Sequence, residues 1–88
     1  LDLTVLPEKY QNQYDFIVMN PPFHEGKRTD SDIGIAFIQS AHKALRKRGV
    51  LWMVANNQLP YEAALQKLFF KSELIIQKNG FKVFRAEK

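Results

Sequence analysis

The sequence predicts an α/β fold in which mainly parallel strands are covered by helices and an antiparallel hairpin closes the sheet. Three observations predict it. Short apolar runs alternate with segments of helical periodicity, which is the pattern of strands connected through helices. The runs are continuously apolar, as in strands buried on both faces. Between the last two runs lies Asn79-Gly80, a strong signal for a hairpin turn.

The first strand is predicted at Tyr14–Asn20, where consecutive apolar residues with a β-branched centre precede the asparagine. Pro21 and Pro22 end this strand because neither has a backbone N–H to donate to a neighbouring strand. Only a weak apolar stretch, Leu3–Leu6, comes before it.

A helix is predicted next, capped by Thr29 or Asp30 and stopped at Gly49. Apolar residues at helical spacing give this helix one buried stripe. The stripe consists of Phe37, Ile38, Ala41, Ala44 and Leu45. The C-terminal end carries the cations Lys43, Arg46, Lys47 and Arg48. Because cations suit the negative end of the helix dipole, we interpret them as a solvated helix end rather than an RNA surface.

The second strand is predicted at Val50–Ala55, an entirely apolar run that places Trp52 in the core. Pro60 fits the first position of a second helix that runs to about Phe70. The buried face of that helix is predicted to consist of Ala64, Leu65, Leu68 and Phe69.

The last two strands are predicted at Leu74–Ile76 and Phe81–Phe84. Four strands make a thin sheet, and the strand at Tyr14–Asn20 lacks a strong partner for its other edge. An open apolar edge invites pairing with another chain. Since the sequence also starts with Leu1 rather than Met, we expect residues 1–88 to be the C-terminal half of a larger α/β fold. The exposed strand would then allow self-association.

Composition excludes several classes of protein. The chain has no cysteine, which removes disulfide scaffolds, Cys-ligated zinc and thiol catalysis and fits a cytoplasmic protein. No apolar run approaches the roughly 20 residues of a membrane span. No spacing of His, Asp and Glu suggests a metal site, and no Ser-His-Asp set is visible. A net charge of +4 favours a polyanionic partner.

One motif carries chemistry: Asn20-Pro21-Pro22-Phe23, placed where an apolar strand meets its C-terminal loop. In open α/β sheets ligands bind at that edge. A planar amino group is a poor nucleophile because its lone pair is delocalised, so an enzyme that methylates it needs acceptors for both N–H protons. The side-chain oxygen of Asn20 and the backbone carbonyl of Pro21 supply two such acceptors, and Phe23 offers a flat face for stacking.

The alternative interpretation is an Asn-Pro turn that merely stops a strand, since such dipeptides initiate turns. Its position after a buried strand and before a capped helix favours the functional interpretation.

The run Asp15–His24 resembles motif IV of S-adenosylmethionine-dependent amino-group methyltransferases. It is most similar to the ribosomal RNA guanine-N2 methyltransferases of the small-domain methyltransferase superfamily. Further matches are His24, Gly26, Thr29, Val54-Ala55-Asn56, Leu59-Pro60-Tyr61 and Phe81–Ala86. The resemblance covers nearly all of the chain from about Asp15 onward.

The resemblance implies a Rossmann-like methyltransferase sheet and S-adenosylmethionine-dependent methylation of the N2 amine of a guanine in ribosomal RNA. The partner would be ribosomal RNA or the ribosomal subunit. Asn20 and Pro21 would be the catalytic residues, with Asn20 also near the methionine side of the cofactor. The residues expected to bind substrate are Pro22, Phe23, His24, Lys27, Arg28, Asn56 and Tyr61. Lys27 and Arg28 would meet RNA phosphates. We expect His42, on the first helix, to face solvent.

The sequence departs from the family in one respect. The glycine-rich cofactor loop of the family lies upstream of motif IV, and here the four glycines are scattered. We therefore expect the substrate-side half of a methyltransferase domain, without the cofactor-loop half and inactive alone. Two alternatives stay open: methylation of adenine N6 or a protein glutamine amide, and a non-catalytic remnant or interaction module.

Overall fold

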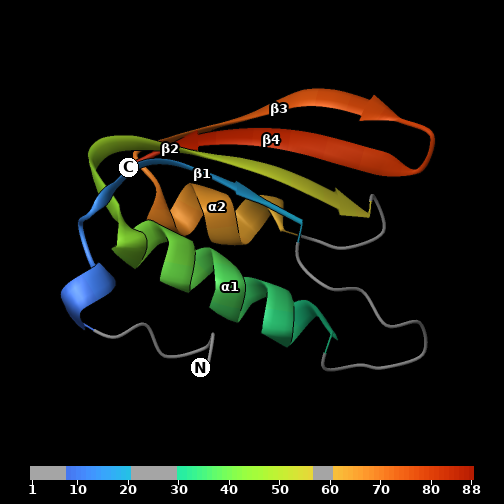
Figure 1. Cartoon of the computed structure of the whole chain (residues 1–88). Coiled ribbons are helices and arrows are strands. Elements are labelled where there is room, and N and C mark those ends of the chain that lie inside the picture. The colour runs from blue at the N-terminus through green and yellow to red at the C-terminus, as the bar shows by residue number, and fades with distance from the viewer. Residues whose placement is uncertain (1–7, 21–29, 57–60) are drawn as a thin grey trace.

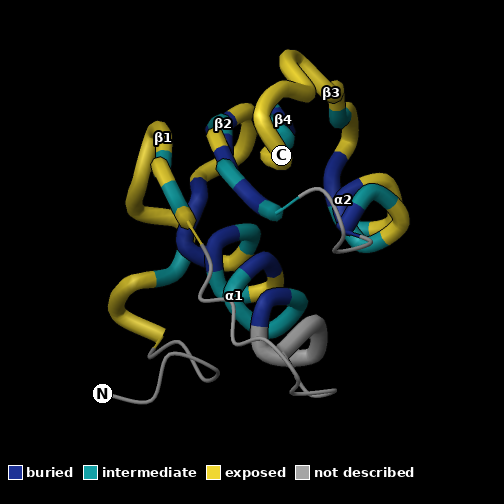
Figure 2. The backbone as a smooth tube through the Cα atoms, turned by 90° about the vertical axis from the view of Figure 1, so that its right-hand side faces the viewer, coloured by how far each residue is buried: buried dark blue, intermediate teal, exposed yellow. Residues whose placement is uncertain are grey.

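The computed structural model describes residues 8–20, 30–56 and 61–88 of the chain. After a 3-10 turn at Glu8–Tyr10, the elements follow in the order strand, helix, strand, helix, strand, strand. They are β1 (Tyr14–Met19), α1 (Asp30–Ala44), β2 (Leu45–Asn56), α2 (Glu62–Leu68), β3 (Lys71–Lys78) and β4 (Phe81–Glu87). The strands form one sheet in the order β1-β2-β4-β3, and both helices lie on the same side of it (Figures 1 and 2). The predicted α/β fold is confirmed.

The pairing of the strands has the predicted mixture of directions. β1 runs parallel to β2, with Phe16 beside Val50 and Met19 beside Met53. β4 runs antiparallel to both β2 and β3. Asn79 and Gly80 join β3 to β4 with φ angles of 53° and 83°. Positive φ at both central residues is the signature of a type I′ hairpin turn, which explains why Asn-Gly stands there.

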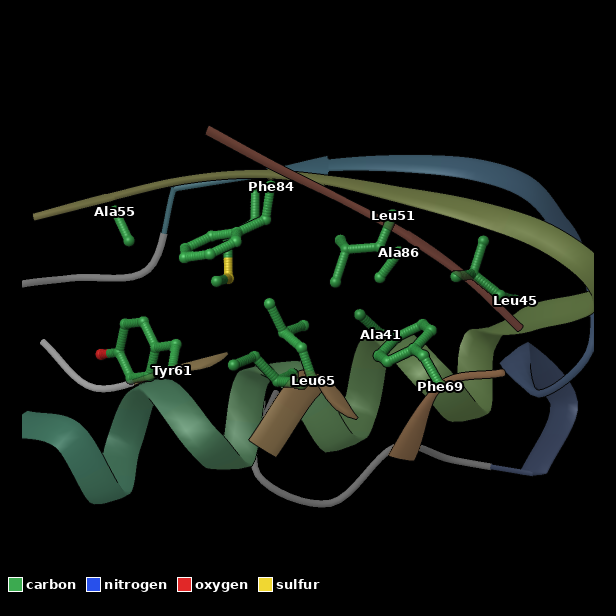
Figure 3. Close-up of a cluster of buried hydrophobic side chains, with 11 residues drawn as sticks. Ala41, Leu45, Leu51, Ala55, Tyr61, Leu65, Phe69, Phe84 and Ala86 are labelled. Atoms are coloured by element: carbon green, nitrogen blue, oxygen red, sulfur yellow. The ribbon is translucent and has the colours of Figure 1, made fainter. Parts of the chain in front are cut away.

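The core lies between the two helices and one face of the sheet (Figure 3). Leu51, Met53 and Ala55 point to this face from alternate positions of β2. They meet Ile38 of α1 and Leu65 of α2, both fully buried. Ile38, rather than its neighbour Phe37, is the most deeply buried member of the predicted stripe on α1.

The opposite face of the sheet is open in the described part of the chain. Val18 of β1 is 71% exposed, and Trp52, its partner on β2, is 37% exposed. The prediction that Trp52 belongs to the core is therefore wrong for this chain. Strand residues alternate between faces, and both described helices lie on the other one. Neither of these helices is long and apolar enough to cross a membrane.

The first helix ends at Ala44, earlier than the predicted stop at Gly49. The backbone N–H groups of Asn12 and Gln13 donate to the carbonyl oxygens of Lys43 and Ala44, at 2.8 and 2.9 Å. These bonds satisfy carbonyls that a helix end leaves without intrahelical donors, so α1 stops at Ala44.

Gly49 does not stop the helix but lies inside β2, where the chain approaches itself closely. A Cβ at Gly49 would lie 2.8 Å from the carbonyl oxygen of Arg46 and 3.1 Å from that of Asp15. The cations Arg46, Lys47 and Arg48 consequently belong to β2 and not to a helix end. Only Lys43 of the basic cluster remains on α1.

Candidate active site

Two of the predicted site residues lie at the carboxyl edge of the parallel strands. Asn20 directly follows β1 and is exposed, and Asn56 is the last residue of β2 and is half-buried. Because β1 and β2 are parallel, both strands end at the same edge, toward which both arrows point in Figure 1. This is the edge at which open α/β sheets bind ligands.

The core holds these two strand ends in place. Ile17 and Met19 of β1 pack against the core cluster just before Asn20. Met53 and Ala55 are buried in that cluster just before Asn56. The strand pattern thus anchors apolar side chains below the sheet and delivers an amide side chain at the end of each strand.

The other motif residues lie outside the described residues. This holds for Pro21, Pro22, Phe23, His24, Lys27 and Arg28. The joint grip of an amino group by the Asn20 amide and the Pro21 carbonyl therefore stays a prediction.

Tyr61 lies inside the protein, immediately before α2. Its side chain is completely buried in the core cluster (Figure 3). Its hydroxyl packs against Gly34 of α1, where a Cβ would lie only 1.9 Å from the hydroxyl oxygen. Gly34 precedes Ile38 and Ala41 at helical spacing on the buried stripe. A residue without a side chain at that place is the sequence signal that could have indicated a bulky partner.

An ion pair that sequence reasoning missed fastens the start of α2 to the sheet. Lys82 Nζ on β4 donates to Glu62 Oε2, the first residue of α2. Lys82 stands beside Ala55 in the sheet register, one residue before Asn56. The hydrogen bond from Lys82 lowers the pKa of Glu62 below its usual 4.5. Nothing in the spacing of the two residues along the sequence predicts this pair.

The structure shows no set of metal ligands at the carboxyl edge among the described residues. Among residues 8–20, 30–56 and 61–88, no group of three or more His, Cys, Asp or Glu side chains lies close enough to hold a metal ion. The chemistry of the described edge is that of amide side chains.

Parallel strands that end in amide side chains at one edge, with a hairpin closing the sheet, are typical of a Rossmann-like α/β protein with a ligand site at that edge. Over residues 3–85 the chain matches the methyltransferase small domain. The chain belongs to this family.

Named relatives agree with the match. "Ribosomal RNA small subunit methyltransferase C" of Idiomarina loihiensis is 42% identical over 74 residues, which cover 84% of this chain and 22% of the relative. The protein of that name from Escherichia coli O9:H4 is 41% identical over 76 residues, covering 86% and 22%. The chain thus spans about a fifth of the length of these relatives.

Solved structures share the fold. The T. thermophilus 16S rRNA N2 G1207 methyltransferase, in complex with AdoMet and guanosine, superposes with a TM-score of 0.74 at 36% identity. The match covers 89% of this chain and 21% of that one. The antibiotic-resistance methyltransferase Kmr, at 15% identity and a TM-score of 0.57, shares the fold alone. The resemblance to ribosomal RNA guanine-N2 methyltransferases is confirmed.

Proposed function

We propose that this chain is the substrate-side part of an enzyme that methylates the exocyclic N2 amine of a guanine in ribosomal RNA. The observation that carries the proposal is the placement of Asn20, exposed at the carboxyl end of β1 in a chain of the methyltransferase small domain family. The names of the relatives supply the class of substrate, and the T. thermophilus structure supplies the guanosine ligand.

The reaction needs the amino group held rather than deprotonated in advance. The Asn20 side-chain oxygen and the Pro21 carbonyl accept the two N–H protons and restore lone-pair character to the nitrogen. The target base first flips out of the RNA helix, which costs a few kcal/mol, and Phe23 then stacks on it. Holding the amine in line with the donor contributes on the order of 7–11 kcal/mol at best.

S-adenosylmethionine would supply the methyl group when it is bound. The residues of this chain fit only part of that cofactor. Asn20 is the one residue assigned to its methionine side, and the sequence contains no glycine-rich loop. The upstream half of the fold has to provide that loop.

The remaining predicted contacts divide by position. Pro22 belongs to the motif and contacts the nucleotide, and His24, Lys27 and Arg28 follow the motif and contact the nucleotide and its phosphates. Asn56 lines the base pocket from the neighbouring strand. The sequence predicts that Tyr61 binds substrate, but its side chain has no exposed surface in the structure. We therefore propose an indirect part for it, in which the buried ring fixes the start of α2 beneath that edge. We also propose a cytoplasmic location, because the proposed substrate is ribosomal RNA.

The missing half of the fold is itself a proposed partner. The outer edge of β1 has no strand beside it in the described part of the chain. We propose that an upstream strand pairs with this edge in the complete enzyme. The 88-residue chain alone would then self-associate along β1.

The test replaces Asn20 by Ala in the complete enzyme. The rate of methyl transfer should fall about 10²–10³-fold, as when one donor or acceptor of a preorganised site is removed, with RNA affinity unchanged. Gln13→Ala is the matched control, because it removes an exposed carboxamide from the other end of β1. A loss of affinity without a loss of rate would refute the assigned role.

Two experiments distinguish the alternatives: the methylated product identifies the acceptor, and reconstitution with an upstream half tests for a non-catalytic remnant. Mass spectrometry of nucleosides from treated RNA distinguishes N2-methylguanine from N6-methyladenine, and a methylated peptide identifies glutamine. A remnant would stay inactive when the chain is joined to the upstream half of a relative. For the 88-residue chain alone, calorimetry should show no micromolar binding of S-adenosylmethionine.

A further inference from the structure

A basic groove lies at the end of the sheet opposite Asn20 and Asn56. It has a volume of about 480 Å³ and is lined by Lys47, Arg48, Phe70, Glu87 and Lys88. These residues come from the start of β2, the junction between α2 and β3, and the end of β4. In Figure 1 this end of the sheet is the one beside the C label.

A wide bulge in β2 creates the cationic wall of the groove. The register between β1 and β2 passes from Tyr14–Leu45 to Phe16–Val50, so residues 46–49 stand opposite Asp15 alone. Residues in a regular strand alternate between faces, whereas the three consecutive cations in this bulge are all exposed.

The backbone of the bulge is fixed. Arg48 has a φ of 70°, in the left-handed region that glycine tolerates better than arginine. Its N–H donates to the carbonyl of Lys88, and the N–H of Lys88 donates to the carbonyl of Gly49, both at 2.9 Å. The side chain of Arg48 therefore leaves from a rigid position.

Two of the cations near the groove are engaged within the protein. Arg46 Nη1 pairs with Asp15 Oδ1 at 2.9 Å. Lys88 Nζ donates to the carbonyl of Leu45 at 2.8 Å and to Asn12 Oδ1 at 3.0 Å, and burial lowers its pKa. These two cations stabilise the wall of the groove, and their internal contacts leave them few free donors for a ligand.

Lys47 and Arg48 provide the charge that remains. Neither forms an ion pair with any residue of the three described segments. The side-chain carboxylate of the groove, Glu87, lies 3.7 Å from Arg85 Nη2. The groove thus presents two cations, Lys47 and Arg48, that have no ion-pair partner among the described residues.

An aromatic ring stands beside these charges. Phe70 is 85% exposed, more than any other large apolar side chain of the described residues. The preceding Phe69 is buried in the core and holds the chain at this point. A solvated ring next to two cations matches single-stranded nucleic acid, in which phosphates alternate with flat bases. An acidic peptide would use the charges but not the ring.

We propose that this groove binds single-stranded RNA several nucleotides away from the target nucleotide, with Lys47 and Arg48 on phosphates and Phe70 stacked on a base. The proposal rests on the proposed function for the identity of the nucleic acid. The stretch of β2 from Val50 to Asn56 separates groove and candidate active site by roughly 20 Å, at about 3.3 Å per residue. A strand of several nucleotides spans this length, within the site sizes of about 4–16 nucleotides known for single-strand binders.

The test measures binding of a fluorescein-labelled A12 RNA to the 88-residue chain by fluorescence anisotropy at several salt concentrations. Lys47→Gln combined with Arg48→Gly should weaken binding at least tenfold and reduce the salt slope by about 1.4, since each phosphate contact on a single strand contributes about 0.7. Arg48→Gly also relieves the positive φ, so this substitution should not destabilise the backbone, and circular dichroism checks that the variant is folded.

Phe70 is tested in the same way. Phe70→Ala should weaken binding roughly 5- to 100-fold, while Phe70→Trp should keep it. The matched control is Lys67→Gln, which removes an exposed lysine of α2 outside the groove and should change affinity by less than about twofold.

Three results would overturn the proposal: no binding of RNA by a chain that circular dichroism shows to be folded, equal losses in Lys67→Gln and the groove variants, or displacement of the RNA by polyglutamate at equal charge. Failure here differs from failure of the proposed function. In the complete enzyme the groove variants should raise KM for RNA and leave kcat unchanged, whereas Asn20→Ala should lower kcat. If Asn20→Ala has no effect while the groove variants still lose RNA, only the methyltransferase role falls.

Discussion

The two faces of the sheet differ in what covers them, although β1 and β2 present apolar side chains to both. On the face that carries α1 and α2, Leu51 and Met53 of β2 have no exposed surface. On the other face, Trp52, which lies between them, is 37% exposed, and its partner Val18 on β1 is 71% exposed. Strands of this composition are typical of sheets covered on both sides. In the described residues, helices cover only one of these two faces, and this difference supports the proposed upstream half, which would cover the other.

Truncating one apolar side chain on each face should give the largest difference in the free energy of unfolding between the two faces. Leu51→Ala should lower the free energy of unfolding by about 2–5 kcal/mol, because it leaves a cavity in the core. Val18→Ala should change it by less than about 0.5 kcal/mol, because the side chain is already solvated. Urea unfolding of the two variants of the 88-residue chain measures both.

A fusion of the chain to an upstream half sharpens the comparison. In that fusion protein, Val18→Ala should cost about 0.5–1.5 kcal/mol or more, as for a buried methyl-bearing residue. If Val18→Ala stays neutral there, the open face of the sheet is not an interface within the enzyme.

The covered face also contains a close contact between Gly34 of α1 and Tyr61, the residue before α2. Gly34→Ala should destabilise the chain by about 1–3 kcal/mol despite the better helix propensity of alanine, because the new Cβ would overlap the hydroxyl of Tyr61. Tyr61→Phe in the same background should restore part of the loss, since the ring carbons still lie within 2.4–2.8 Å of that Cβ.

The control for this pair is Gln39→Ala, at an exposed position of α1, which should be neutral or slightly stabilising. Thermal unfolding followed by circular dichroism reports the stability of the three variants and of the wild type. Equal effects at Gly34 and Gln39 would show that the buried ring does not confine the helix.

The sequence predicted the elements that depend on contacts between residues close together along the chain. The β-branched run before Asn20, the spacing of Ile38 and Ala41, and the Asn79-Gly80 turn each fixed an element in advance. The end of α1 could not be predicted from its neighbours, because the donors that end it come from Asn12 and Gln13, about thirty residues earlier.

The same limit applies to the candidate site. The placement of Asn20 and Asn56 at one edge follows from the parallel direction of two predicted strands. The burial of Tyr61 depends on a gap at Gly34, and the bulge that exposes Arg48 depends on pairing with β1. Contacts between distant segments decide these features, and a pattern along the chain does not record them.

The ion pair at the start of α2 tests whether polar contacts also differ between the faces. Lys82, with a side chain only 13% exposed, binds Glu62 on the covered face, whereas Arg85 on the open face lies 3.7 Å from both Glu73 and Glu87. We expect a coupling energy of about 1 kcal/mol for Glu62–Lys82 in a double-mutant cycle with Glu62→Gln and Lys82→Met. The corresponding cycle for Glu73–Arg85 should give about half of that or less.

The pH dependence of the first pair has a definite sign. The pKa of Glu62 is lowered in the folded chain, mainly by the hydrogen bond from Lys82, so the unfolded chain binds the proton more readily. The pair therefore stabilises the fold above the usual pKa of 4.5, and this contribution is lost as the pH falls through the folded value. Urea midpoints between pH 6 and pH 3 should fall less steeply in Glu62→Gln; an unchanged slope would contradict the assignment.

The smallest expected effect comes from His42, which the sequence placed in solvent and the structure packs edge-on against Phe69, with ring centroids 5.0 Å apart. The pKa of His42 is lowered from 6.5, first by burial and then by the charge of Lys88. Since the unfolded chain takes up the proton first, stability is full above pH 6.5 and declines as the pH falls through the folded value. Between pH 7 and 5.5, above the range in which carboxylates titrate, urea midpoints of the wild type should drop slightly and those of His42→Gln should stay level. A matching drop in His42→Gln would mean that another group titrates there and that the covered face tolerates a charge beside Phe69.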